Sequence, residues 1–339
     1  MNNRKFQYPD VRQVAVVGSG VAGLCTARLL MEQGASVTLF EKSRGPGGRL
    51  AAKRVTGGSA DMGAQYFTIR SPAFQDFLAR FAGEGSFARW DARLGFQAPD
   101  GHWQTFPHEP RYVGVPRMTA ISRALSDGLD IRAQTRITTM ARNDRCWTLT
   151  DTDGQDFGPF DEVVITAPPA QTRDLLADSN LAALAEHLRG PVSAILPCWA
   201  VAAYFNEPPY SEFDGMRPND EILYWVANNT SKPGRSEQGQ WWVLHATPDW
   251  SAANENTPPD AVVDAMVAAF RALTGTASEP LETLAHRWLY ARSVGSDASG
   301  KPGCLWYPEE GVGLAGDWLS GGRVEGAYLS AEALVREMI

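Results

Sequence analysis

The segment VAVVGSGVAG, residues 14–23, decides the fold of this chain. Its first half, Val14 to Val17, has the continuous apolar character of a buried parallel strand. A helix is predicted next, with a stop at Gly34 and an apolar face made of Leu24, Ala27 and Met31. A second apolar run at 37–40 completes a strand–helix–strand unit, which is typical of a doubly wound sheet.

Three glycines in this segment predict a dinucleotide site. Gly18 permits the tight turn, Gly20 lets the backbone approach a pyrophosphate, and Gly23 lets helix and strand pack closely. The helix opens at Val21, and its N-terminus faces the anion. Glu41 ends the second strand, where a carboxylate accepts hydrogen bonds from both ribose hydroxyls. This pattern does not separate NAD from FAD.

The size and charge are those of an ordinary globular protein, with 339 residues, 44% of them hydrophobic and 21% charged. This length allows two domains, or one large domain with an inserted lobe. The net charge of −8 argues against nucleic-acid binding, which needs a basic face. It leaves room for a small anionic ligand, because a few arginines can dominate one cleft.

Cysteine usage and hydropathy limit the class of protein further. The four cysteines have no CxxC spacing, which predicts free thiols and neither a disulfide framework nor a metal site: Cys25, Cys146, Cys198 and Cys304. Residues 1–13 are polar and lack the apolar core of a signal peptide, so we expect a short frayed extension. No segment approaches the roughly 18 apolar residues of a membrane span. We therefore expect a cytoplasmic protein without a membrane partner.

The remaining elements follow from periodicity and turn residues. Strands are predicted at 135–138, 147–150, 163–166, 199–205, 241–245 and 312–315, with short antiparallel strands within 87–104 and a hairpin turn at 153–154. Helices are predicted at 71–82, 116–125, 259–273 and 324–338. For the third of these helices, Thr257 is the candidate cap and Gly275 the end. Residues 43–60 have little periodicity and are interpreted as a functional loop.

The segment EKSRGPGGR, residues 41–49, indicates FAD. It resembles the second glycine–arginine motif of the amine-oxidase-like flavoproteins. An arginine beyond a flexible glycine pair can reach back to the FAD pyrophosphate, where its planar fork suits phosphate oxygens. We assign this role to Arg49 and count Lys42 as a further cofactor contact. Lys53 and Arg54 are interpreted as residues of a solvated loop.

A third motif, GDW at 316–318 followed by RVEGA at 323–327, resembles the closing motif of the same flavoproteins. Asp317 would bond the ribityl chain, and the helix N-terminus near Val324 would lie under the flavin, where its positive end stabilises the anionic reduced form. Gly316 and Ile137 complete the predicted cofactor contacts. Cys304 lacks the pattern around a covalent flavin link, so we expect non-covalent FAD.

These features predict an α/β fold with an α+β inserted lobe. The expected architecture is a Rossmann-like FAD-binding domain with a mixed-sheet substrate domain. The discontinuous FAD-binding domain is assigned to residues 1–70, 112–170 and 290–339. The substrate-binding domain takes residues 71–111 and 171–289.

Three blocks resemble the renalase family in its bacterial branch. They are DMGAQYFT at 61–68, HRWLYAR at 286–292 and the closing GDW and RVEGA motif, and the resemblance is weaker from 207 to 240. It implies an FAD oxidase of isomeric dihydronicotinamide dinucleotides, with hydride at ring position 2 or 6. Such enzymes return these isomers to NAD(P)⁺ and pass the electrons to O₂, giving H₂O₂. Bacterial members favour the 2-dihydro isomer.

Oxidising a dihydropyridine yields an aromatic cation, so hydride moves directly to flavin N5 and no general base is required. The site must instead hold a ring flat against the flavin. Gln65 and Tyr66 are expected to touch the flavin. The predicted substrate wall is Tyr66, Phe67, Thr68, Arg70, Phe96, Cys198, His245, Trp288 and Arg323. A packing role for His245, Trp288, His286 and Cys198, and a surface position for Arg70, remain open.

Two other functions remain open from sequence. One is an amine oxidase or a desaturase-like enzyme on the same scaffold, because a fold does not fix its function. The other is a flavin-binding protein without turnover. A plain NAD-linked dehydrogenase would leave the Arg49 and Asp317 motifs unexplained.

Overall fold

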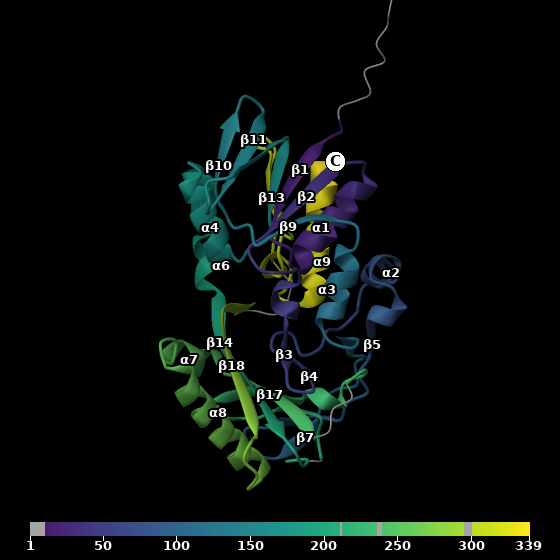
Figure 1. Cartoon of the computed structure of the whole chain (residues 1–339), viewed down its shortest axis with the longest axis vertical. Helices are drawn as coiled ribbons and strands as arrows, with labels where there is room; N and C mark the ends of the chain where they lie inside the picture. Colours follow the sequence, from purple (N-terminus) through teal and green to yellow (C-terminus); the bar gives the residue numbers. More distant parts are fainter. Residues whose placement is uncertain (1–10, 211, 236–238, 295–299) are drawn as a thin grey trace, which may run out of the picture.

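A six-stranded sheet forms the upper half of the molecule (Figure 1). The computed structural model describes residues 11–210, 212–235, 239–294 and 300–339. The strand order is β19-β20-β13-β1-β2-β9, in which all neighbours are parallel except the edge strand β19. The strands are β1 (Gln13–Val17), β2 (Ser36–Glu41), β9 (Asp130–Ala133), β13 (Glu162–Ile165), β19 (Leu305–Tyr307) and β20 (Val312–Leu314).

Successive residues of β1 face opposite layers, because side chains alternate along a strand. Val14 and Val16 pack with one hydrophobic cluster, which includes α1 (Val21–Glu32), α3 (Thr119–Ser126) and α9 (Val324–Met338). Ala15 packs with the opposite cluster, under α4 (Pro169–Asp178) and the sheet β10-β11-β12. These strands are β10 (Ile137–Asn143), β11 (Cys146–Asp151) and β12 (Asp156–Phe160). The upper half is therefore a three-layer Rossmann-like unit.

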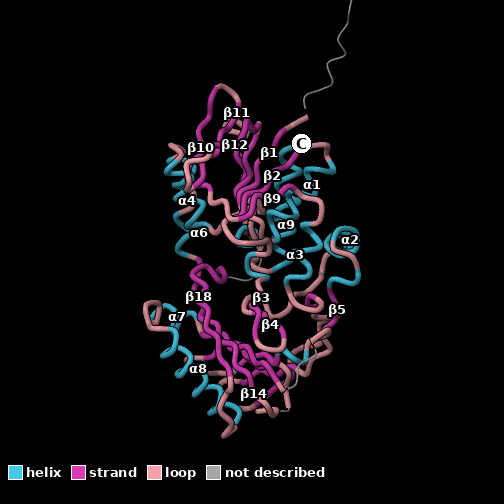
Figure 2. The backbone as a smooth tube through the Cα atoms, in the orientation of Figure 1, coloured by secondary structure: helices cyan, strands magenta, loops and turns pink. Residues whose placement is uncertain are grey.

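A seven-stranded mixed sheet forms the lower half (Figure 2). Its order is β18-β14-β17-β16-β15-β6-β7, antiparallel except for the β15–β6 pair. The strands are β6 (Leu94–Gln97), β7 (Trp103–Thr105), β14 (Ile195–Phe205), β15 (Gly215–Arg217), β16 (Leu223–Asn228), β17 (Gln240–Ala246) and β18 (Glu282–Ser293). α7 (Pro248–Ala253) and α8 (Pro259–Thr274) lie beside it, and α8 contributes Val262, Met266 and Phe270 to the core of one face.

The opposite face of the lower sheet meets a hairpin of β3 (Ala52–Val55) and β4 (Gly58–Asp61). Ala60 and Met62 pack there against Ala200 and Val243. This hairpin lies between the two halves in Figure 1. The remaining elements are α2 (Pro72–Phe81), β5 (Phe87–Arg89) paired with β8 (Tyr112–Gly114), α5 (Ala182–Glu186) and α6 (Arg189–Ser193).

The predicted fold class is confirmed. The opening strand–helix–strand unit, the helices at 72–81 and 324–338, and the hairpin turn at 153–154 are all present. Gly275 ends α8 in the left-handed conformation, with φ of 71°. The division into domains by residue ranges stays a prediction. Residues 1–10, most of the predicted N-terminal extension, lie outside the described residues.

Some local predictions were wrong. Residues 43–60 are not a plain loop, because their second half forms the β3–β4 hairpin, whose exposed Lys53 and Arg54 hide the strand pattern. Met31 is 42% exposed, and Leu30 takes its place on the buried face of α1. Thr257 does not cap α8, since Pro258 holds that position and the Thr257 hydroxyl donates to Asn254 Oδ1.

Three element boundaries also differ from the prediction. α3 begins at Thr119, later than expected, because the preceding residues form a turn in which the Ala120 N–H bonds to the Arg117 carbonyl. β10 begins at Ile137, because the Thr135 N–H instead bonds to the Glu41 carbonyl. β14 begins at Ile195, where it pairs with the end of β18.

All four cysteines are free thiols in the structure. Within the described part of the chain, no helix has the length and apolar character needed to cross a membrane.

Replacing Met266 by alanine tests the packing of α8 on the lower sheet. Its side chain is fully buried, so the Met266→Ala variant should lose about 2–5 kcal/mol of unfolding free energy. The matched control is Met31→Ala, which alters a side chain that is 42% exposed and should lose less than about 0.5 kcal/mol. Urea unfolding followed by tryptophan fluorescence would measure both. Equal losses would contradict the described core.

Candidate functional site

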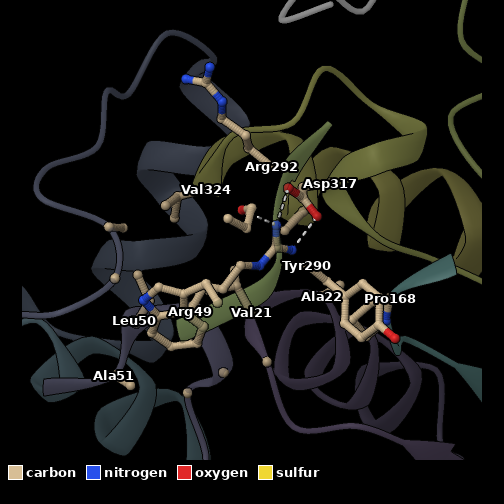
Figure 3. A pocket seen from close by; sticks show the side chains of 18 of the residues that line it. Val21, Ala22, Arg49, Leu50, Ala51, Pro168, Tyr290, Arg292, Asp317 and Val324 are labelled. Carbon is tan, nitrogen blue, oxygen red and sulfur yellow. Dashed lines mark hydrogen bonds and ion pairs between the residues drawn. The ribbon is translucent and has the colours of Figure 1, made fainter. Parts of the chain in front are cut away.

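A cavity of about 1860 Å³ lies between the two halves and is lined by residues of both. It is larger than the roughly 300–1,000 Å³ of an ordinary small-molecule pocket, so it can hold two ligands or one very large one. The C-terminal ends of β1, β2 and β13 open onto it, which is where open α/β sheets bind ligands. Figure 3 shows part of its wall.

The glycine-rich turn after β1 is shaped for the close approach of a ligand. Gly18 has φ of 104°, and its N–H bonds to the Phe40 carbonyl at 2.9 Å. A Cβ at Gly23 would collide with the Gly18 carbonyl oxygen, so only glycine permits this packing of helix and strand. A Cβ at Gly20 would have no atom within 4 Å, which shows open space on the cavity side.

The first turn of α1 has no side-chain cap. Gly20, Val21 and Ala22 line the cavity there, so the positive end of the helix and its first backbone N–H groups lie where an anion could bind. Gly23 itself does not line the cavity and acts through packing alone.

Glu41 is held rigidly at the end of β2. Its carboxylate accepts hydrogen bonds from the Ser19 N–H at 3.1 Å, the Ser19 hydroxyl at 2.7 Å and the Ser43 N–H at 2.8 Å. Its side chain is 8% exposed and lines the cavity. This fixed carboxylate meets the requirement for a ribose contact. Lys42 and Ile137 line the same region.

Arg49 and Asp317 form a bidentate ion pair in the cavity wall (Figure 3). Arg49 Nη1 lies 3.0 Å from Asp317 Oδ2, and Nη2 lies 2.5 Å from Oδ1. Arg49 also donates to the Ala291 carbonyl at 3.1 Å. Burial lowers the pKa of Arg49, but the Asp317 carboxylate more than reverses this effect and raises it. The pair therefore brings together Arg49, which was predicted to contact the FAD pyrophosphate, and Asp317, which was predicted to contact the ribityl chain.

The second helix N-terminus at the cavity belongs to α9. Its first turn has no side-chain cap, and Arg323, Val324 and Ala327 line the cavity. Glu325, in the same turn, is 6% exposed and accepts hydrogen bonds from the Arg70 N–H at 3.1 Å and the Ser71 N–H at 2.6 Å. Glu325 was not predicted as a site residue, although an acid in the first turn of a helix is a recognisable signal.

A fully buried charge cluster fixes the segment 61–68 in the cavity wall. Lys232 Nζ lies 3.1 Å from Asp61 Oδ2, and Arg235 Nη2 lies 2.5 Å from the same oxygen. Lys232 also donates to Gln65 Oε1 at 3.1 Å. Burial raises the pKa of Asp61, but the two cations more than reverse this and hold it below its usual range. Burial lowers the pKa of Lys232 to about 8, against the opposing effect of Asp61.

Most of the predicted substrate wall lies around one cavity. Gln65, predicted to touch the flavin, lines this cavity. Eight of the residues predicted for the substrate wall also line it: Tyr66, Phe67, Thr68, Arg70, Cys198, His245, Trp288 and Arg323. Phe96 is not among the residues that line the cavity: its ring contacts that of Phe106 edge to face, with ring centroids 5.4 Å apart, and Phe106 lines the cavity instead. The alternation of side chains along β6 was not enough to show which of the two rings lines the cavity.

The family model for the flavin containing amine oxidoreductases matches residues 72–339, and one for an NAD(P)-binding Rossmann-like domain matches residues 16–81. The chain belongs to the flavin containing amine oxidoreductase family. The uncapped α1, the open space at Gly20 and the fixed Glu41 fit the FAD of this family, whereas the guanidinium of Arg49 binds Asp317 and the Ala291 carbonyl in the structure.

Relatives of this flavoprotein include a hydroxyneurosporene desaturase of Rubrivivax gelatinosus, 43% identical over 67 residues, which are 20% of this chain and 13% of that protein. Putrescine oxidase of Kocuria rosea is 32% identical over 123 residues, 35% of this chain and 25% of that one. A solved structure from Exiguobacterium sp. 255-15, provisionally named a protoporphyrinogen oxidase, has a TM-score of 0.75 at 14% identity, covering 96% of this chain and 98% of that one. The sequence matches thus span a quarter or less of these relatives, and the structural match shows the fold alone.

His245 and Trp288 of the flavoprotein bind the same carbonyl. Trp288 Nε1 donates to the Met62 carbonyl at 2.9 Å, and His245 Nε2 lies 3.1 Å from it. Because a carbonyl only accepts, His245 carries its proton on Nε2. Burial lowers the pKa of His245 to about 4, so the ring is neutral near pH 7. His286 contacts Trp288 edge to face, with ring centroids 4.4 Å apart.

Cys198 is not a nucleophile at neutral pH. Burial raises the pKa of its thiol to about 12, and its Sγ donates to backbone carbonyls. A protonated, buried thiol is chemically inert. The cavity wall of the flavoprotein therefore offers no thiolate at Cys198, and His245 with its low pKa is only a weak base. His286 also lines the cavity, and burial lowers its pKa.

The lining of the cavity has the opposite charge to the chain. Thirteen lysines and arginines line it against five acids, a formal charge of +8 where the whole chain has −8. The basic residues are Lys42, Arg44, Arg49, Lys53, Arg54, Arg70, Arg111, Arg123, Arg136, Arg217, Arg287, Arg292 and Arg323, and the acids are Glu41, Glu109, Asp174, Asp178 and Asp317. Such a cleft concentrates anions.

Substituting Gly23 tests the turn that the cofactor needs. In the Gly23→Ala variant the new Cβ would collide with the Gly18 carbonyl, so the turn must shift and most bound flavin should be lost. The matched control is Gly190→Ala, since a Cβ at that exposed helical glycine meets no atom within 4 Å. The flavin absorbance per mole of purified protein measures the effect. Full flavin content in Gly23→Ala would refute this account of the turn.

The neutral His245 should make stability depend on pH. Its pKa is about 4 when folded and 6.5 ordinarily, so between these values the unfolded chain binds a proton that the folded chain does not. Unfolding free energy should fall by up to roughly 3 kcal/mol as the pH drops through this window. The His245→Gln variant should lack this component, and the exposed-site control His102→Gln should keep it. Identical urea-unfolding profiles for all three proteins would contradict a buried neutral His245.

Proposed function

We propose that this flavoprotein is a renalase-like FAD oxidase that converts 2-dihydroNAD(P), and as a second isomer 6-dihydroNAD(P), to NAD(P)⁺. The observation that carries the proposal is the +8 charge of the cavity lining. Both FAD and the proposed substrate are pyrophosphates, so one cationic cavity of about 1860 Å³ suits the two together.

The reaction balances as dihydroNAD(P) plus O₂ and one proton giving NAD(P)⁺ and H₂O₂. A ring C–H bond breaks with its electron pair, and the pyridine ring becomes aromatic without losing a proton to the protein. Bound FAD supplies the hydride acceptor that O₂ reoxidises. The reaction needs no general base, so it is compatible with the protonated Cys198 and with the low pKa of His245, which makes that ring a weak base.

The chain's own contribution is to hold a flat ring in place. Tyr66 lies 5.5 Å from Trp225 between ring centroids, and Phe106 lies 5.8 Å from the same indole, so three rings wall one part of the cavity. Lys232 and Asp61 fix the segment that carries Gln65 and Tyr66. We propose that this wall orients the substrate ring, with Thr68, Arg70, Trp288 and Arg323 around it.

Non-covalent binding of FAD is also proposed. Of the four cysteines, only Cys198 lines the cavity, and its raised thiol pKa of about 12 opposes attack on a flavin carbon.

The second candidate is amine oxidation, which the family match and the likeness to putrescine oxidase favour. Putrescine carries two amines that are protonated in solution. A cavity lined by an excess of cations repels such a substrate, so the charge of the lining supports the first candidate over the second.

Anaerobic stopped-flow mixing with 2-dihydroNAD, 6-dihydroNAD, NADH and putrescine tests the proposal. We expect rapid loss of flavin absorbance with 2-dihydroNAD and no loss with NADH or putrescine. Loss with 6-dihydroNAD would show that the second isomer is also a substrate. The Tyr66→Phe variant should retain turnover, because no proton transfer is required of its hydroxyl. Reduction by putrescine alone would overturn the proposal in favour of amine oxidation, and an intact flavin spectrum with every compound would favour a protein without turnover.

A further inference from the structure

Two arginines of the cavity wall share one tyrosine ring. Arg292 Cζ lies 3.9 Å from the centroid of the Tyr224 ring, and Arg217 Cζ lies 5.3 Å from it. The three residues come from β18, β15 and β16, and all line the cavity. Two strands, β14 and β17, separate β18 from β16 in the sheet, so the contact between Arg292 and Tyr224 joins two strands that are not neighbours.

Neither guanidinium is neutralised by an acid within the described ranges, 11–210, 212–235, 239–294 and 300–339. Two other arginines of the cavity do have acidic partners. Arg49 pairs with Asp317, and Arg70 pairs with Glu109. A tyrosine ring attracts each cation, so Tyr224 holds two like charges at the same end of the cavity. Two like charges without an acidic partner become more favourable when an anion binds beside them.

The cluster belongs to the substrate part of the cavity. Burial is the main cause of the lowered pKa of His245, and the charge of Arg292 adds to it. Burial raises the pKa of the Cys198 thiol, and the charge of Arg292 acts in the opposite direction and lowers it. In Figure 3 the side chain of Arg292 points away from the Arg49–Asp317 pair. Arg292 therefore lies near the substrate wall, and its guanidinium is separate from the pair assigned to FAD.

We infer that Arg217, Tyr224 and Arg292 form a subsite for a phosphate group of the substrate. The inference rests on the proposed function and names the part of the substrate that this end of the cavity recognises. A guanidinium fork matches two phosphate oxygens, and two forks held by one ring form a clamp. The cavity then has two phosphate sites, one at Arg49 and α1 for FAD and one at this clamp for the substrate dinucleotide.

The subsite predicts selection by charge. A phosphorylated dihydronicotinamide, as dinucleotide or mononucleotide, should bind well. The uncharged dihydronicotinamide riboside has the same reacting ring but no phosphate, so it should bind weakly and gain nothing from the clamp.

The test compares the 2-dihydro isomers of NAD, nicotinamide mononucleotide and nicotinamide riboside on the flavin-loaded enzyme. Arg217→Gln and Arg292→Gln should each raise KM for the two phosphorylated substrates about tenfold, with kcat little changed, because the clamp binds ground state and transition state alike. KM for the riboside should not change. Arg189→Gln on α6, an exposed residue outside the cavity lining, is the matched control and should leave all three KM values unchanged.

Arg217→Lys and Arg292→Lys guard against loss of structure, since they keep the charge and should restore part of the affinity. Equal increases of KM for the riboside and the nucleotides would overturn the inference and assign the arginines a role in shaping the pocket.

A binding measurement separates this inference from the proposed function. Inorganic pyrophosphate should perturb the absorbance of the oxidised flavoprotein in a saturable way, and the two glutamine variants should weaken this binding about tenfold each. If no dihydro isomer reduces the flavin but pyrophosphate binding depends on both arginines, the proposed oxidase function is wrong and the anion-binding subsite is supported. If pyrophosphate binds equally to all variants, the site fails.

Discussion

A buried carboxylate with two cationic partners holds the two halves of the molecule around the cavity. Asp61 ends the hairpin between the sheets, and Lys232 and Arg235 reach it from the loop after β16. The Met118 N–H, just before α3, donates to Asp61 at 3.0 Å. Removing one partner of such a buried cluster leaves an uncompensated charge, at a cost of about 3–5 kcal/mol. With the cluster intact, the segment 61–68 cannot move without breaking contacts to both halves of the molecule.

That constraint gives the cavity its chemical character. The Met62 carbonyl binds Trp288 and His245, and Gln65 is held by Lys232. These contacts fix a wall that includes the rings of Tyr66 and Trp288. Around this wall the charge is strongly positive, although the chain as a whole is acidic. A fixed wall and a positively charged lining suit the binding of an anionic substrate whose ring is held in one place.

Local signals in the sequence were enough for part of this description. Gly18, Gly20 and Gly23 predict the first turn because each glycine answers a local steric requirement, and Glu41 follows at a fixed distance along the chain. The closing motif at Gly316 and Asp317 lies at the cavity for similar reasons. Non-local contacts were out of reach: Lys232 lies 171 positions from Asp61, and nothing near it marks it as buried. The exchange of Phe96 for Phe106 and the hidden β3–β4 hairpin depend likewise on tertiary packing.

We expect the cavity to select an anionic dinucleotide and to reject cationic amines. Calorimetric titration of the oxidised flavoprotein with NAD⁺ and, separately, with putrescine tests it most directly. The account predicts saturable binding of NAD⁺ that weakens as the salt concentration rises, and no binding of putrescine. Saturable binding of putrescine, with no heat from NAD⁺, would contradict it.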